Sequence, residues 1–92
     1  MHALYATVTI AEGQGDAAQK ALKEQVVPRV RSAPGFVKGI WTVSPDRRSG
    51  ASIVVFKTEQ DANNAAQMAR SNPTPPGVTL GSVAVCEVAA EA

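Results

Sequence analysis

Residues 51–57 constrain the fold of this chain more than any other part of the sequence. They read Ala-Ser-Ile-Val-Val-Phe-Lys, so apolar side chains fall on both alternating faces of an extended segment. β-Branched residues at its centre favour a strand, and a strand that is apolar on both faces is covered on both sides of its sheet. We therefore expect residues 51–57 to form a central strand with a further layer on each face.

Three other segments predict strands. Residues 3–10 alternate between apolar and more polar side chains, and residues 36–44 and 78 to about 88 are also rich in apolar and β-branched types. The turn at residues 45–50 contains Pro, Asp, Ser and Gly, which are typical of turns. Because this connection is short, residues 36–44 and 51–57 are expected to form an antiparallel hairpin.

Two helices are expected between the strands. Asp16 with Gln19 and Thr58 with Asp61 have the spacing of capping boxes, which mark helix starts. Pro28 lies in the first helix and removes a backbone donor, so it predicts a kink in the last turns. Alanines recur along the second helix, which permits close approach to a sheet.

The resulting order, β-α-β-β-α-β, predicts an α+β fold of the ferredoxin-like type. This is an antiparallel four-stranded sheet with two helices on one face. Ninety-two residues fit one domain, residues 1–92. Two helices on one face leave the other apolar face of residues 51–57 uncovered, and a second copy of the chain is the simplest cover. We therefore predict a homodimer.

Charge and cysteine content exclude several functions. Nine Lys and Arg against eight Asp and Glu give a net charge of +1, which argues against a nucleic-acid partner. No basic-then-apolar leader and no uncharged run of about 18 residues is present, so no membrane span is expected. A single cysteine excludes an intrachain disulfide, and one cysteine with one histidine disfavours a structural zinc site. We expect a cytoplasmic protein without metal or cofactor.

Two corner segments resemble a known family. Residues 27–41 contain a helix end followed by Pro-Gly-Phe and a strand with an aromatic residue, and residues 56–62 form the matching corner from third strand to second helix. Together they resemble the antibiotic-biosynthesis-monooxygenase-like (ABM-like) families of the dimeric α+β barrel superfamily. The resemblance implies a dimer whose sheets face each other across a barrel, and it extends over nearly the whole chain.

The resemblance also bears on activity. The family includes cofactor-free oxygenases of aromatic polyketides, haem-degrading enzymes and members without assigned activity. Haem-degrading members carry an Asn on the first strand, a Trp on the second helix and an axial His beyond it. Those places correspond to Ala6 and Ala65 here, and no histidine follows His2. Haem degradation is therefore disfavoured.

Four aromatic residues are candidates for lining a pocket: Tyr5, Phe36, Trp41 and Phe56. Trp41 either stacks on a planar ligand or packs in the core or the dimer interface. Tyr5 lies on the more polar face of the first strand, where its hydroxyl either faces the cavity or makes a structural hydrogen bond. For Phe36 and Phe56, core packing is the simpler interpretation. No catalytic residue is assigned.

Other reactive or charged residues have simpler interpretations. Arg29 and Arg31 either rim a pocket and attract an anionic ligand or form a solvated helix end. Arg47 lies in a turn that is expected to be solvated. His2 is expected to be frayed and exposed, and Cys86 to be a small buried residue of the last strand.

The sequence thus favours a small dimeric barrel protein that binds a small hydrophobic or planar ligand, without establishing catalysis. The alternative is a cofactor-independent monooxygenase of an aromatic small molecule, and a third possibility is an interaction scaffold. The shortage of titratable groups favours the non-catalytic hypotheses. The sequence does not decide whether the protein is an enzyme.

Overall fold

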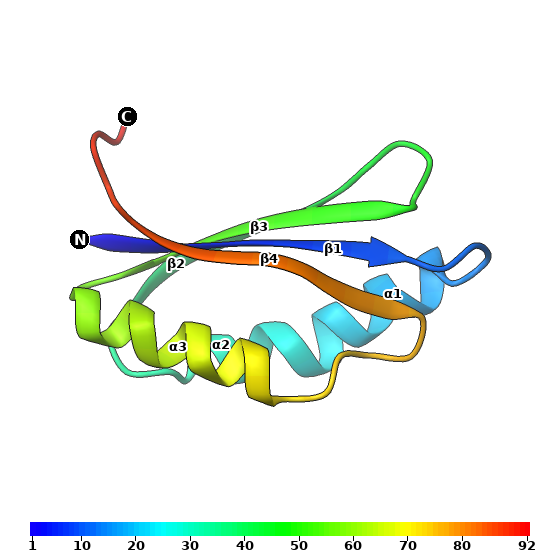
Figure 1. Ribbon diagram of the computed structural model, residues 1–92, viewed down its shortest axis with the longest axis horizontal. Coiled ribbons are helices and arrows are strands. Elements are labelled where there is room, and N and C mark those ends of the chain that lie inside the picture. Colours follow the sequence, from blue (N-terminus) through cyan, green and yellow to red (C-terminus); the bar gives the residue numbers. More distant parts are fainter.

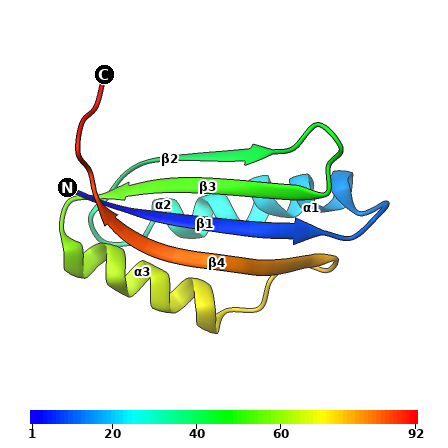
Figure 2. The same ribbon diagram turned by 45° about the horizontal axis from the view of Figure 1, so that its top comes forward.

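The computed structural model describes residues 1–92 and contains an antiparallel sheet with its helices on one face (Figure 1). The sheet order is β2-β3-β1-β4, so β3 and β1 are central and β2 and β4 form the edges (Figure 2). The predicted α+β fold and the β2–β3 hairpin are confirmed. None of the helices has the length and apolar character needed to cross a membrane. The strands are β1 (His2–Ile10), β2 (Phe36–Val43), β3 (Ser49–Phe56) and β4 (Val78–Glu87).

The hydrophobic core lies between the sheet and α3 (Glu59–Ser71). Phe56 on β3 and Ala62 on α3 are completely buried. Residues four apart on a helix share a face, so Ala62 and Ala66 face the sheet together, and their small side chains allow a close approach. The core cluster consists of Leu4, Val54, Phe56, Ala62 and Ala66.

The opposite face of the sheet carries no helix, as Figure 1 shows. Ile40, Ile53 and Tyr5 are direct partners across β2, β3 and β1, and they are 61%, 48% and 41% exposed. We call these three residues the open-face row. The prediction that residues 51–57 lie in a central strand is confirmed. The layer expected on its second face is for the most part not provided by this chain.

The C-terminal segment covers one end of this open face. It turns to the side of the sheet away from the helices (Figure 1), where Glu91 forms an ion pair with Lys38 of β2 (3.2 Å). Val55, which pairs with both Lys38 and Ala3, is only 6% exposed. The tail and its surroundings therefore shield this end of β3, while the open-face row stays accessible.

The first and last strands lie side by side. β1 pairs with β4 from His2 opposite Glu87 to Ile10 opposite Val78, with an irregularity between Ala6 and Val8. The two chain ends meet at one end of the sheet (Figure 2), where the Val88 N–H donates to the Met1 carbonyl (3.0 Å).

The irregularity predicted at Pro28 is a π-helical turn. The first helical segment runs through α1 (Gly15–Ala21), the π-helix η1 (Leu22–Val26) and α2 (Val27–Arg31). The Val27 N–H donates to the Leu22 carbonyl, five residues back. A proline ring clashes with the carbonyl four residues before it, so a wider turn just before Pro28 relieves that conflict.

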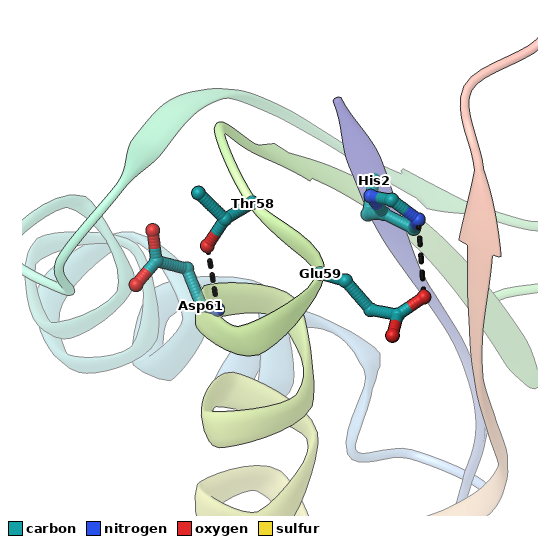
Figure 3. Close-up of polar contacts among 4 residues, drawn as sticks. All are labelled: His2, Thr58, Glu59 and Asp61. Carbon is teal, nitrogen blue, oxygen red and sulfur yellow. Dashed lines mark hydrogen bonds and ion pairs between the residues drawn. The ribbon is translucent and has the colours of Figure 1, made fainter.

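The two helix starts differ from each other. The Thr58 Oγ1 accepts a hydrogen bond from the Asp61 N–H (3.1 Å), as predicted for a helix cap (Figure 3). The prediction of Asp16 as a cap is wrong. The N-cap is Gln14, two residues earlier, and the Asp16 carboxylate instead pairs with Arg47 (2.9 Å).

The tip of the β2–β3 hairpin is exposed, as expected, and that Arg47–Asp16 ion pair links it to α1. Both side chains are largely exposed, and such a pair adds little stability. At the same tip, the Ser44 hydroxyl donates to the Asp46 carboxylate (2.6 Å) and the Arg48 N–H donates to the same oxygen (3.0 Å). These hydrogen bonds lower the pKa of Asp46.

The two corner segments that resemble the ABM-like family are in contact. Gly35 has a φ of +78°, and the Lys57 N–H donates to its carbonyl (2.9 Å). A Cβ placed on Gly35 would overlap the Asp61 carboxylate at the start of α3. Gly35 therefore meets both a conformational and a steric requirement that other residues do not.

Replacing Gly35 by Ala is expected to destabilise the protein more than replacing Gly13 by Ala. Both glycines have φ near +80°, which costs an L-residue about 1–2 kcal/mol. Only Gly35 has a neighbour that a methyl group would displace, because the space around Gly13 is open. The additional loss is expected to be about 1–3 kcal/mol. Urea unfolding of both variants measures it, and equal losses would contradict the role assigned to Asp61.

Candidate ligand-binding cavity

A cavity of about 250 Å³ lies on the helix side of the sheet. It is bounded by the sheet, by the segment α1–η1–α2, by α3 and by the loop at residues 72–75. Nineteen of its 28 lining residues are hydrophobic, and its boundary contains the Leu22 and Val26 ends of the π turn. The arrangement is a predominantly apolar pocket of the kind that takes small organic ligands.

Small residues at the centre of the sheet leave room for the cavity. Ala6 on β1 pairs with Ser52 on β3, and Ser52 pairs with Trp41 on β2, so these three lie in one row facing the helices. Larger side chains at Ala6 and Ser52 would fill the space, as Leu4 and Val54 do in the next row. The small residues at these two central strand positions therefore leave the space that forms the cavity.

Trp41 forms an aromatic wall of this cavity. It is half-buried, and its indole lies across Gly39, two residues back on the same face of β2. A Cβ on Gly39 would come within 2.6 Å of the indole Cη2 and 2.7 Å of Cζ3. Only glycine at position 39 allows the indole this place, so Gly39 positions Trp41.

The structure places the four sequence-derived aromatic candidates on different faces. Trp41 and Phe56 line the cavity. Phe36 packs edge-on against Phe56, with ring centroids 6.4 Å apart, and lies in the adjoining core rather than on the cavity wall. Tyr5 belongs to the open-face row, on the other side of the sheet.

Most of the polar residues of the lining carry no recognisable signal in the sequence. The Thr42 hydroxyl donates to the Ala51 carbonyl and the Thr74 hydroxyl to the Val78 carbonyl, so both are engaged within the chain. The side chains of the remaining polar lining residues make no hydrogen bond within the chain. The loop at 72–75 shows no periodic pattern, so its contribution was not visible before the sheet order was known. The free polar side chains are Gln19, Arg29, Ser52 and Asn72.

The lining contains a single ionisable side chain, that of Arg29. No Asp, Glu, His, Cys or Tyr borders the cavity, and no cluster of three or more His, Cys, Asp or Glu residues exists that would hold a metal ion. The cavity can bind through apolar contact, a few amide and hydroxyl groups and one guanidinium, but it offers no ordinary proton acceptor.

His2 and Cys86 lie away from the cavity, and both expectations for them were wrong. His2 is part of β1 and is half-buried, because its ring reaches the Glu59 carboxylate at the start of α3 (3.3 Å; Figure 3). Cys86 is exposed rather than buried. It lies opposite Ala3, on the edge strand β4 and on the face without helices, so nothing in this chain covers it.

Comparison with solved structures shows two similar folds. A mutant of MhuD, solved with two manganese protoporphyrin IX groups bound per active site, matches with a TM-score of 0.65 at 20% identity. The match covers 100% of this chain and 98% of that chain. A monooxygenase from the gene ActVA-Orf6 of Streptomyces coelicolor, in complex with nanaomycin D, matches with a TM-score of 0.58 at 14% identity. That match covers 99% and 91% of the two chains.

These similarities define the class of fold. Both solved proteins have the ABM-like fold, and the present chain shares it over essentially its full length. The resemblance drawn from residues 27–41 and 56–62 is therefore confirmed at the level of the fold. No protein-family model and no curated protein matches the sequence.

Replacing Gly39 by Ala is expected to displace the Trp41 indole, because the new methyl group would occupy its place. The expected result is a changed Trp emission spectrum and a loss of about 1–3 kcal/mol of stability. Fluorescence and near-UV circular dichroism measure the first effect, and urea unfolding measures the second. Lys38→Ala is the control, since Lys38 is adjacent on β2 but points to the open face. An unchanged Trp spectrum in Gly39→Ala would contradict the positioning role.

Proposed function

We propose that this chain forms a homodimeric α+β barrel protein that binds a small, hydrophobic, planar ligand in the cavity between its sheet and its helices. The observation that carries the proposal is the apolar cavity with the flat Trp41 indole on its wall. Aromatic rings bind planar ligands by stacking, and transfer of apolar ligand surface out of water contributes about 25 cal/mol per Å².

The solved structures of the same fold support ligand binding. One contains manganese protoporphyrin IX and the other nanaomycin D. The fold alone does not specify a ligand, because function depends on the side chains that line the site. In this chain those side chains are mostly aliphatic, with Trp41 and Phe56 as the aromatic members.

A cofactor-independent monooxygenase acting on an aromatic small molecule is the second candidate. It is favoured by the fold shared with a monooxygenase that carries nanaomycin D. In such a reaction a ring CH₂ group and O₂ become a carbonyl group and water, with the substrate supplying the electrons. The substrate must first lose a proton, and the lining has no carboxylate or imidazole to accept it. This absence supports binding ahead of catalysis.

Haem degradation is not the function that we propose. The resemblance aligns Ala6 and Ala65 with the Asn and Trp of haem-degrading members, and both alanines line the cavity. As a possible iron ligand, the lining offers the Met68 thioether but no imidazole, thiolate or phenolate. The only histidine, His2, is engaged with Glu59 outside the cavity.

The dimer that we propose forms through the open face of the sheet. Ile40, Ile53 and Tyr5 cross three strands as a continuous exposed row, and no element of this chain covers them. Contact with the same face of a second copy would remove this apolar surface from water, as an isologous interface requires.

Trp41→Ala is expected to remain folded and to lose ligand binding, because Trp41 is half-buried on a cavity wall rather than enclosed in the core. Isothermal titration with 9,10-anthraquinone, a planar uncharged probe, measures the binding. The expected loss is about tenfold or more, or about 1.4 kcal/mol. Tyr5→Ala on the opposite face is the control and is expected to retain binding. Equal affinity in Trp41→Ala and in the unsubstituted protein would contradict this placement of the ligand.

Native mass spectrometry of untagged protein is expected to give twice the chain mass of 9.5 kDa. Ile53→Glu is expected to give the monomer, because it places a carboxylate at the centre of the open-face row. Met68→Glu is the control, since Met68 is equally exposed (48%) but lies on the helix side. A dimer that survives Ile53→Glu would show that the copies meet elsewhere, and a monomeric unsubstituted protein would refute the dimer.

A further inference from the structure

The lining of the cavity carries one positive charge and no negative charge. Of its 28 lining residues only Arg29, on α2, is charged, and no carboxylate borders the space to balance it. The remaining lining is aliphatic, aromatic or neutral polar. A neutral apolar ligand would gain no ion pair from this cation. The unbalanced positive charge therefore favours a ligand that carries a negative charge as well as an apolar part.

The Arg29 guanidinium has no partner within the chain. The three ion pairs of the structure join His2 to Glu59, Lys38 to Glu91 and Arg47 to Asp16, and none includes Arg29. Its side chain donates no hydrogen bond to another residue, although the Arg29 carbonyl accepts one from the Ser32 hydroxyl. All five guanidinium donors are therefore available to a ligand.

The neighbours of Arg29 on its own helical segment leave it unpaired as well. The positions three and four residues away are Gln25, Val26, Ser32 and Ala33, all without charge. A carboxylate at one of these positions would be close enough to pair with the guanidinium. Arg29 shares the cavity lining with Val26 and Val30 of the same helical segment.

A guanidinium beside an apolar cavity favours one chemical group in particular. Its planar fork matches the two oxygens of a carboxylate and donates two parallel hydrogen bonds. Arg29 is exposed, so this attraction acts at the rim of the cavity and is weakened by added salt. An anionic ligand held in this way would be oriented, with its carboxylate at the exposed Arg29 and its apolar part inside.

We propose that the ligand of this cavity is a planar aromatic carboxylate whose carboxylate pairs with Arg29, so that Arg29 is the specificity-determining residue of the site. This inference rests on the proposed binding function and narrows it to a substrate class. It adds a second contact, at the rim, to the stacking contact of Trp41 on the wall.

Arg31 provides a matched control. It lies two residues further along the same helix and carries the same charge, but it does not line the cavity. Arg29→Gln and Arg31→Gln therefore change the net charge equally and alter the same helix end. Only the first removes the cation at the cavity, so a difference between the two variants cannot come from long-range charge alone.

The test uses two probes of the same shape, 2-naphthoate and the neutral 2-naphthamide, with Trp41 fluorescence as the readout of binding. The unsubstituted protein is expected to bind 2-naphthoate about tenfold more tightly than 2-naphthamide at neutral pH, or by about 1.4 kcal/mol. Arg29→Gln is expected to bind both probes equally, and Arg31→Gln is expected to keep the preference. Added salt is expected to weaken only the binding of 2-naphthoate.

The outcomes separate this inference from the proposal on which it rests. Equal binding of both probes to the unsubstituted protein, or a preference that survives Arg29→Gln, would overturn the role of Arg29 and leave the cavity as a ligand site. Failure of both probes to bind would count against the cavity itself. Far-UV circular dichroism of each variant establishes that the fold is retained, as expected for exposed side chains.

Discussion

The contact between Phe56 and the alanine face of α3 is the interaction on which the rest of the molecule depends. Because Ala62 and Ala66 have small side chains, α3 lies close to the central strands there, and Phe56 is completely enclosed. The first helical segment does not form that core cluster apart from the flanking contact of Val30. The cavity lies between α3, which packs closely on the sheet, and the segment α1–η1–α2, which packs less closely. The small residues Ala6 and Ser52 form its floor on the sheet.

Local patterns predicted the fold but only part of the site. Alternation in residues 3–10, the two-faced strand 51–57 and the Thr58 cap each depend on near neighbours in sequence, and each is confirmed. The location of Tyr5 relative to the cavity depends on which face the helices cover, which is a long-range property. The position of Trp41 depends on Gly39 and on Ser52 of the neighbouring strand. Composition and periodicity alone therefore could not decide whether Trp41 lines a cavity or packs in the core.

The errors have a common physical cause. The prediction that Asp16 caps a helix followed from spacing alone, whereas an arginine on a distant hairpin provides its partner. The burial expected of Cys86 followed from apolar neighbours in sequence, but β4 lies at the edge of the sheet and Cys86 faces away from the helices. Both depend on contacts between segments more than 25 residues apart. The same holds for Arg29, whose isolation is visible only when the surrounding strands and helices are placed.

The pairing of β1 with β4 has a consequence for how the chain acquires its structure during synthesis. His2 lies opposite Glu87, so the first and last strands are separated by nearly the whole sequence. Closing a loop of that length lowers the entropy of the chain before the hydrogen bonds and packing between β1 and β4 can stabilise the pair. Until β4 has left the ribosome, β1 has only β3 beside it and its other edge is unpaired. The sheet is therefore completed by its last strand, and the nascent chain exposes a central strand as a temporary edge until then.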